Sequence, residues 1–207
     1  MTTSSTAVAE PRRSEARERL LSTAAGIFYA EGIRTVGVDR IIAEASVTKA
    51  TFYRHFPSKD DLALAYLRSV DIAIRGRLDA AAETADPFEL LRIVGGGIAD
   101  DLCRPGYRGC AFINAAAEYS DPDDPIRQLV TEHRAWFQQF LVDTLSRAGH
   151  PNPVGAANHV ALMRDGAMVR GYLSDPIEAG EVLMRGIEGT IRFIKGEWPE
   201  VTELPPA

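Results

Sequence analysis

The chain has 207 residues, of which 45% are hydrophobic and 25% charged, and this composition excludes a disordered chain. No apolar run approaches the ~20 residues of a membrane span, and the polar N-terminus does not have the pattern of a secretory signal. We therefore expect a cytoplasmic globular protein, of one medium-sized domain or two small ones, with no membrane partner.

The net charge of −6 is distributed unevenly along the chain. Residues 1–60 contain 9 basic and 7 acidic residues, a net charge of +2. Residues 61–207 contain 14 basic and 22 acidic residues, a net charge of −8. Attraction to a polyanion should therefore be local to the N-terminal part, because an acidic remainder weakens non-specific binding.

Helical periodicity accounts for nearly the whole chain, which predicts an all-α fold. Residues 1–13 and 198–207 are polar and lack periodicity, so we expect them to be tails. The spacing of apolar residues, together with turn signals, predicts helices over residues 14–30, 38–45, 48–55, 59–82, 88–102, 110–119, 126–145, 154–173 and 177–195.

Three consecutive glycines, Gly95, Gly96 and Gly97, lie inside the predicted helix 88–102. Each of them costs a helix about 1 kcal/mol relative to alanine. Such a run marks a kink, the close approach of another helix or a hinge, and periodicity does not distinguish these alternatives.

The two short helices predicted between residues 37 and 56 form a helix–turn–helix. In the second of them, Phe52 and Phe56 are spaced to be buried on one face. Its other polar side chains are hydrogen-bond donors, with no acidic residue among them: Thr48, Lys49, Thr51, Tyr53, Arg54 and His55. A helix–turn–helix whose second helix displays such donors fits the major groove of DNA.

The run from Thr48 to Leu62 resembles the helix-turn-helix signature of TetR-type transcriptional repressors, the TetR/AcrR type. This resemblance implies an N-terminal three-helix DNA-binding domain and a long fourth helix that leads to a C-terminal helical domain for effector binding and dimerisation. We accordingly expect a DNA-binding domain over residues 14–74, with the helix-turn-helix at 37–56, and an effector and dimerisation domain over residues 75–197.

The resemblance also implies which residues contact an operator: Thr35, Gly37, Thr48, Lys49, Ala50, Thr51, Tyr53, Arg54, His55 and Lys59. Within this set, Lys49 and Thr51 are candidates for base edges or phosphates, and Tyr53, His55 and Lys59 for phosphate oxygens. A packing role for Tyr53 and a solvated surface role for Arg54 are the alternatives.

Two positions depart from the pattern of the family. Many members carry a threonine at the start of the first short helix, where this chain has Val36 and Gly37. The phosphate contact would then pass to Thr35 or to the backbone of Gly37. Ser46 stands where glycine is usual in the turn, which puts the backbone geometry of that turn in question.

Family members hold a small, often apolar effector between helices of the C-terminal region. The candidate lining residues combine aromatic rings with a few polar groups, as such a pocket requires: Phe112, Asn114, His133, Trp136, Phe137, Phe140 and Met163. The alternative is that these aromatic residues are ordinary core.

These observations predict a homodimeric repressor that binds a pseudo-palindromic operator, dimerises through the last two helices and is released by a small-molecule effector. A second hypothesis is a regulator of the same fold without a small-molecule effector, either an activator or a protein controlled by a partner. A third is an enzyme on a helical scaffold that uses Cys110 and His133.

The residues give the third hypothesis little support, because nothing fixes Cys110 near His133 and a cysteine in an apolar run is usually core. Cys103 and Cys110 are not expected to form a structural disulfide, since cytosolic thiols are kept reduced. The four histidines lack metal-ligand spacing. We therefore expect no catalytic residues, no metal and no cofactor.

Overall fold

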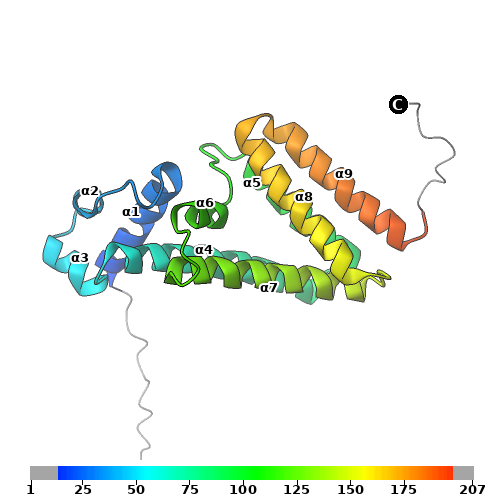
Figure 1. Cartoon of the computed structure of the whole chain (residues 1–207), viewed down its shortest axis with the longest axis horizontal. Helices are drawn as coiled ribbons and strands as arrows, with labels where there is room; N and C mark the ends of the chain where they lie inside the picture. The colour runs from blue at the N-terminus through cyan, green and yellow to red at the C-terminus, as the bar shows by residue number, and fades with distance from the viewer. Residues whose placement is uncertain (1–13, 198–207) are drawn as a thin grey trace, which may run out of the picture. The chain divides into compact units, whose positions relative to one another are not determined.

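The structure, a computed structural model, describes residues 14–197; the predicted tails at 1–13 and 198–207 lie outside the described residues. The described range contains nine helices and no strand (Figure 1), which confirms the predicted all-α class. Among these helices, none is both long enough and apolar enough to cross a membrane.

The chain divides between Tyr66 and Leu67 into two compact units. The N-terminal unit contains α1 (Glu15–Glu31), α2 (Val38–Glu44), α3 (Lys49–His55) and the beginning of α4 (Lys59–Thr84). The C-terminal unit contains the rest of α4 and five further helices: α5 (Pro87–Leu102), α6 (Ala111–Glu118), α7 (Pro125–Arg147), α8 (Pro153–Leu173) and α9 (Pro176–Ile194). Because α4 is continuous, one helix belongs to both units.

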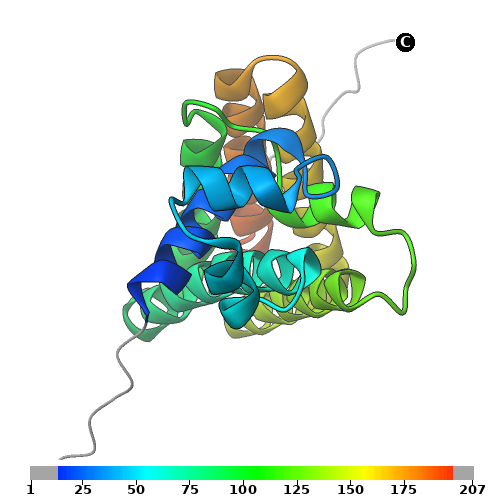
Figure 2. The same ribbon diagram turned by 90° about the vertical axis from the view of Figure 1, so that its left-hand side faces the viewer.

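The N-terminal unit is built on a small apolar core. Leu20 and Ala24 of α1, Ile41 of α2, Phe52 of α3 and Leu62 of α4 are each fully buried. Figure 2 shows α2 and α3 as short helices that run in different directions. A helix of seven residues is marginal by itself, so α2 and α3 depend on this shared core for their stability.

Four helices of the C-terminal unit begin with an acidic residue or asparagine followed by proline. Asp86, Asp124, Asn152 and Asp175 each accept a hydrogen bond from a backbone N–H of the first turn. The proline that follows occupies the first helical position, where its missing N–H is not needed. These four caps explain why the starts of α5, α7, α8 and α9 lie within a residue of the predicted starts.

The C-terminal unit packs α5 against α9 and α8 against both α7 and α9. Figure 1 shows α8 and α9 side by side over their length. Gly95 explains part of this packing, because a Cβ atom there would clash with Ile187 and lie 2.8 Å from Sδ of Met184. Of the three alternatives for the glycine run, Gly95 therefore marks a close helix approach, whereas a Cβ at Gly96 or Gly97 would meet open space.

Candidate functional site

Helix α3 is held by its two phenylalanines and presents its polar face to solvent. Phe52 and Phe56 are buried, and their ring centroids lie 6.3 Å apart. Tyr53 packs edge-on against Phe52 at 5.1 Å, yet it remains 46% exposed. The tyrosine is therefore fixed by packing while its surface stays available for contact.

Thr48 is the N-cap of α3 rather than a residue of the helix itself. Its Oγ1 accepts a hydrogen bond from the backbone N–H of Thr51 at 3.1 Å and lies 2.9 Å from Oγ1 of Thr51. This cap joins the two threonine hydroxyls into one polar group at the start of α3. Both hydroxyls can still accept or donate to a further partner.

The remaining predicted contacts at this end of the unit are also exposed: Thr35, Gly37, Lys49, Ala50 and Arg54. Lys49 forms an ion pair with Asp39 at 3.4 Å, with 66% and 87% of the two side chains exposed. Such an exposed pair stabilises the fold little, so the lysine is free to exchange Asp39 for a phosphate.

His55 and Lys59 already have partners inside the protein. Nε2 of His55 lies 3.2 Å from Oγ of Ser14, and Ser14 makes no side-chain cap of α1 although it stands at the N-cap position. Nζ of Lys59 donates to the carbonyl oxygens of Ile33, Arg34 and Val36 at 3.1–3.2 Å. A lysine ammonium has three donors, and these three carbonyl oxygens of the α1–α2 connection use all of them, so the predicted phosphate contact would require Lys59 to release at least one.

Ser46 has a backbone φ of 52° and lies in the left-handed region. Among the described residues it is the one non-glycine position with a positive φ. Ser46 therefore adopts, at this turn, the left-handed backbone conformation for which glycine is usual.

The C-terminal unit contains a cavity of about 160 Å³. Side chains of α4, α5, α7 and α8 form its walls: Ile74, Arg77, Leu78, Ile93, Val94, Gly97, Ile98, Asp101, His133, Phe137, Arg164 and Met168. Most of these groups are apolar, and a few charged or polar groups converge among them. This combination is typical of a site for a small organic molecule.

His133 is the most buried polar residue of the cavity wall, at 1% exposure. Its Nδ1 lies 2.6 Å from Oδ1 of Asp71, and its ring stacks on Phe112 at a centroid distance of 3.7 Å. Burial lowers the pKa of His133 below its ordinary value, although the hydrogen bond to Asp71 opposes this shift. The imidazole is therefore neutral at pH 7.

Asp71 is ionised beside this neutral imidazole. Burial raises the pKa of Asp71, but hydrogen bonds from Arg75 and His133 outweigh burial, and the pKa lies below its ordinary value. Nε of Arg75 donates to both carboxylate oxygens at 2.8–2.9 Å, and its guanidinium lies 4.5 Å from the ring centroid of Trp136. The carboxylate thereby joins α4 to α7.

The charged residues of the cavity wall pair with neighbouring carboxylates. Nη1 of Arg164 donates to Asp165 at 2.8 Å, and its guanidinium covers Phe137 at 4.9 Å. Nη2 of Arg77 lies 3.9 Å from Asp101. Asp165 also pairs with Arg134 at 2.6 Å and Asp101 with Arg104 at 3.0 Å, so each carboxylate is shared by two arginines.

The seven predicted pocket residues do not lie together around the cavity. His133 and Phe137 line it, Phe112 and Trp136 pack on His133, and Phe140 packs on Trp136. The side-chain amide of Asn114 donates to the carbonyl oxygen of Arg108 instead. Met163 lines a separate groove between α8 and α9.

Sequence reasoning missed Asp71 and Arg164, the charged residues that surround His133 and Phe137. A signal for Arg164 exists, because it is a charge within the small and apolar residues of α8 and is 6% exposed. Asp71 stands among the apolar residues of α4, but only the structure brings it to α7.

Cys110 does not line the cavity, and its Sγ lies 3.7 Å from Nη2 of Arg164. His133 bonds to Asp71 rather than to this thiol. Cys110 and His133 thus have different partners, which leaves the enzyme hypothesis without a nucleophile–base pair. In the described range there is also no cluster of three residues that would suit a metal ion.

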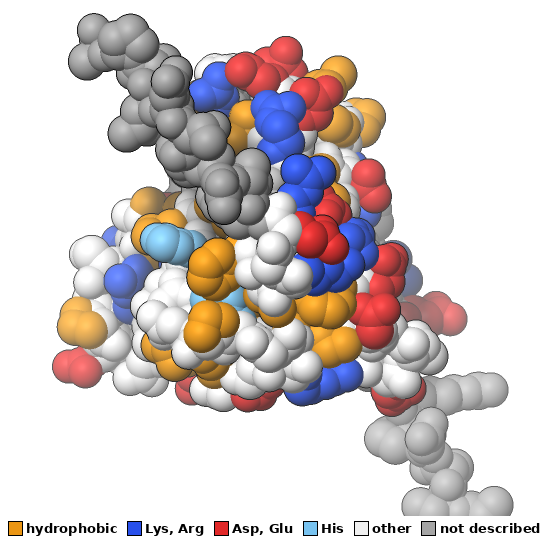
Figure 3. All heavy atoms as spheres, turned by 90° about the vertical axis from the view of Figure 1, so that its right-hand side faces the viewer, with side chains coloured by type: hydrophobic (Ala, Val, Ile, Leu, Met, Phe, Trp, Pro, Cys, Tyr) orange, Lys and Arg blue, Asp and Glu red, His pale blue; other side chains and the backbone are white. Residues whose placement is uncertain are grey.

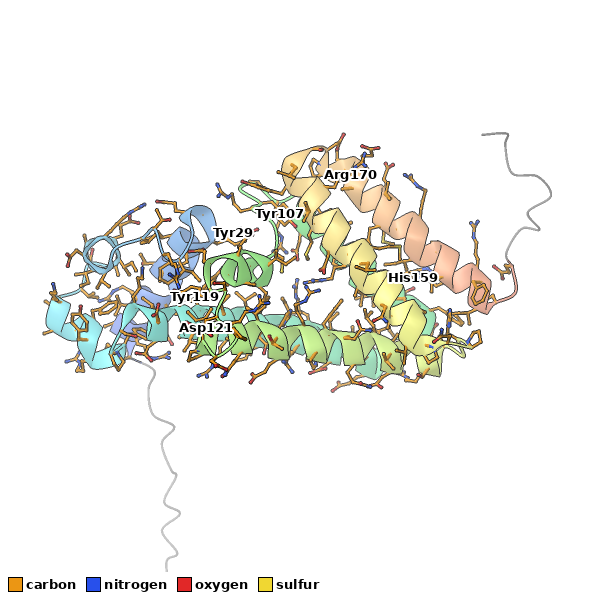
Figure 4. The ribbon with its side chains drawn as sticks, viewed as in Figure 1. Tyr29, Tyr107, Tyr119, Asp121, His159 and Arg170 are labelled. Carbon is orange, nitrogen blue, oxygen red and sulfur yellow. The ribbon has the colours of Figure 1, made fainter. Side chains whose placement is uncertain are left out.

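A groove between α8 and α9 is lined by His150, His159, Leu162, Met163 and Phe193, among other residues. His159, labelled in Figure 4, comes from α8. Figure 3 shows histidine and hydrophobic side chains next to one another on the face that it views.

Tyr107 lies beside the C-terminal half of α8 (Figure 4), where its Oη donates to the carbonyl oxygen of Met168 at 3.3 Å.

The N-terminal unit defines a helix-turn-helix DNA-binding protein, and comparison with known proteins agrees. A family model described as "Bacterial regulatory proteins, tetR family" matches residues 20–66. The crystal structure of SCO4454, a TetR-family transcriptional regulator from Streptomyces coelicolor, is 48% identical, covers 88% of this chain and 97% of that chain, and has a TM-score of 0.84. The chain belongs to the TetR family of transcriptional regulators, as its resemblance to that family predicted.

Curated relatives extend the comparison. The HTH-type transcriptional regulator YjdC from Escherichia coli is 24% identical over 183 residues, which are 86% of this chain and 95% of YjdC. The HTH-type transcriptional activator FasR from Mycolicibacterium smegmatis is 40% identical over 81 residues, 39% of this chain and 37% of FasR. These relatives are transcriptional regulators rather than enzymes.

Proposed function

We propose that this regulator is a homodimeric repressor that binds a pseudo-palindromic operator in the cytoplasm and is released by a small-molecule effector. The observation that carries the proposal is the exposed, acid-free donor face of α3 on a buried aromatic anchor. Thr48, Lys49, Thr51 and Tyr53 would meet base edges and phosphates in the major groove. Thr35, Gly37, Ala50, Arg54, His55 and Lys59 would complete the contact surface.

Dimerisation through α8 and α9 is supported by where the exposed apolar side chains lie. Of the eleven exposed large hydrophobic residues in the described range, eight belong to these two helices: Val154, Leu162, Val169, Tyr172, Leu173, Ile177, Val182 and Phe193. A monomer rarely leaves so much apolar surface in water. Two copies packed through α8 and α9 would bury it in a four-helix bundle.

The 160 Å³ cavity is the proposed effector site, since it is mainly apolar and α4 contributes to its wall. An effector that binds better to one position of α4 shifts the population of the dimer toward that position. Because α4 continues into the N-terminal unit, the two recognition helices would then no longer match successive major grooves.

Filling the cavity tests this proposal without knowledge of the effector. Gly97 lines the cavity and a Cβ there meets open space, so Gly97→Leu should occupy the site while leaving the fold intact. We expect the variant to keep its operator affinity and to lose release by whatever compound releases the wild type. Gly96→Leu, the same substitution outside the cavity lining, is the matched control.

In practice, release of the protein from DNA of its own upstream region is measured by fluorescence anisotropy across a compound library. If Gly97→Leu is released as readily as Gly96→Leu and the wild type, the cavity is not the effector site. If no DNA segment binds preferentially at low salt, the repressor proposal itself is wrong.

A further inference from the structure

One residue that lines the cavity has an unpartnered polar atom. Nε2 of His133 is buried and has no hydrogen-bond partner among the described residues. A buried nitrogen without a partner costs about 1–3 kcal/mol, and native proteins leave few of them. The residue lines a cavity, so a bound molecule is an available partner.

The chemistry of Nε2 is set by Asp71. An ionised carboxylate only accepts hydrogen bonds, so the neutral imidazole must carry its proton on Nδ1, 2.6 Å from Oδ1 of Asp71. Nε2 then bears the lone pair and accepts a hydrogen bond. The unpartnered atom of this lining residue is therefore an acceptor that requires a donor.

The lining of the cavity favours a mainly apolar ligand. Arg164 pairs with Asp165 and Arg77 lies near Asp101, but each carboxylate also pairs with a second arginine, Arg134 and Arg104 respectively. The other walls are mainly aliphatic, with Ile93, Ile98 and Met168 among them. A charged ligand would lose its hydration against these aliphatic walls, whereas an apolar one would not.

The size of the cavity limits the ligand further. Its volume of about 160 Å³ is close to the roughly 150 Å³ of an apolar cavity that holds one benzene molecule. One six-membered ring with a small substituent therefore fits the space as it stands.

We infer that the effector is a ring-sized and mainly apolar molecule whose hydroxyl or N–H group donates to Nε2 of His133. This inference rests on the proposed function, because it takes the cavity to be the effector site. Asp71 acts as a positioning residue that fixes the acceptor tautomer. Because Asp71 lies on α4, the hydrogen bond of the ligand is connected through one imidazole to the helix that continues into the DNA-binding unit.

Three probes of similar shape separate the ligand classes: phenol has a donor, anisole has an oxygen but no donor, and toluene has neither. Calorimetric titration of the full-length protein should give an affinity for phenol about tenfold higher than for anisole or toluene, since only phenol satisfies Nε2. Equal affinities, no binding of any probe, or tighter binding of benzoate, an anionic ring, would overturn the inference. This series needs no variant, so it holds even if substitutions at His133 prevent folding.

His133→Leu removes the acceptor and keeps an apolar wall. We expect it to retain toluene binding and to lose the preference for phenol, whereas His159→Leu, a substitution at an exposed histidine of α8, should keep that preference. A preference for phenol that persists in His133→Leu contradicts the inference.

The tautomer of His133, rather than the stability of the protein, reports on the role of Asp71. In the wild type, the ¹⁵N resonances of His133 should show a protonated Nδ1 and an unprotonated Nε2 at pH 7. In Asp71→Ala this signature should be lost together with the phenol preference. If the signature stays the same in Asp71→Ala, Asp71 does not position the tautomer.

Operator binding without any probe reports on the proposed function separately. If the protein does not bind its upstream DNA, the proposed repressor function fails whatever the probe series shows. If the DNA is bound and another compound releases it while phenol shows no preference, the inference fails and the repressor proposal stands.

Discussion

Ser46 holds the turn between α2 and α3 in a conformation that L-residues avoid. Its φ of 52° costs a non-glycine residue roughly 1–2 kcal/mol. Ser46→Gly removes this strain but gives the unfolded chain more freedom, so we expect a net gain of about 0.5–1 kcal/mol in the free energy of unfolding. Chemical denaturation, monitored by circular dichroism, measures this change in the free energy of unfolding.

Ser174→Gly is the control for this prediction, because Ser174 ends α8 with a φ of −140° and carries no left-handed strain. This substitution should leave stability unchanged or lower it. A Ser46→Gly variant that is no more stable than the wild type would show that the turn relaxes around the serine.

At the scale of residues, the sequence predicted His133 and Phe137 at a pocket because both follow the apolar face of a long helix. It did not predict the partner of His133, because Asp71 lies on another helix and periodicity describes one helix at a time. The extra bonds of Lys59 were hidden for the same reason, since the carbonyl groups that it binds belong to the α1–α2 connection.

Two neighbouring glycines of α5 have opposite surroundings: Gly95 packs closely against α9, whereas Gly96 faces open space. Gly95 faces Ile187 and Met184 of α9, and Ile187 is 1% exposed, so an added methyl group would have to displace the buried end of Ile187. We expect Gly95→Ala to destabilise the protein by about 1 kcal/mol or more through overpacking.

Gly96→Ala provides the matched comparison in the next residue, where a Cβ atom meets open space. It should stabilise the protein by about 0.5–1 kcal/mol, the usual advantage of alanine over glycine in a helix. Thermal unfolding of the two variants measures both effects. If both substitutions stabilise to the same extent, α5 and α9 do not approach as closely as the structure places them.

Helix existence and order could be predicted from the sequence because the local signals are strong. An acidic residue or asparagine followed by proline starts four helices, and Gly32 and Gly149 follow the ends of two others. The function of the glycine run in α5 could not be predicted, since a close approach depends on which helix packs opposite. Which helix packs there is a tertiary feature, and the spacing of apolar residues within α5 does not specify it.

At the scale of the whole molecule, dimerisation can be tested on a matched pair of residues. Leu162 of α8 and Ile72 of α4 are each 69% exposed, but only Leu162 lies on the proposed interface. Leu162→Glu should convert the dimer to monomers in sedimentation experiments, because it places a charge in an apolar contact. Operator affinity should fall about tenfold or more as the two half-site contacts become independent.

Ile72→Glu should leave both the dimer and its operator affinity unchanged. A stable dimer in Leu162→Glu, or dissociation in both variants, would place the interface elsewhere. The helices of the DNA-binding unit could be predicted because its signature is long, whereas the exposed apolar side chains that support the proposed interface are known only from the structure.

Binding of the purified protein to DNA from its own upstream region, measured as a function of salt, tests the DNA-binding function most directly. The net charge of +2 on residues 1–60 and the donor face of α3 predict a specific complex whose affinity falls steeply with salt. The expected log–log slope is about −0.9 for each phosphate contacted. Tyr53→Ala and Lys49→Ala should weaken it while their folded spectra stay unchanged. Equal affinity for unrelated DNA, or an unchanged affinity in both variants, would contradict the assignment of α3 as the recognition helix.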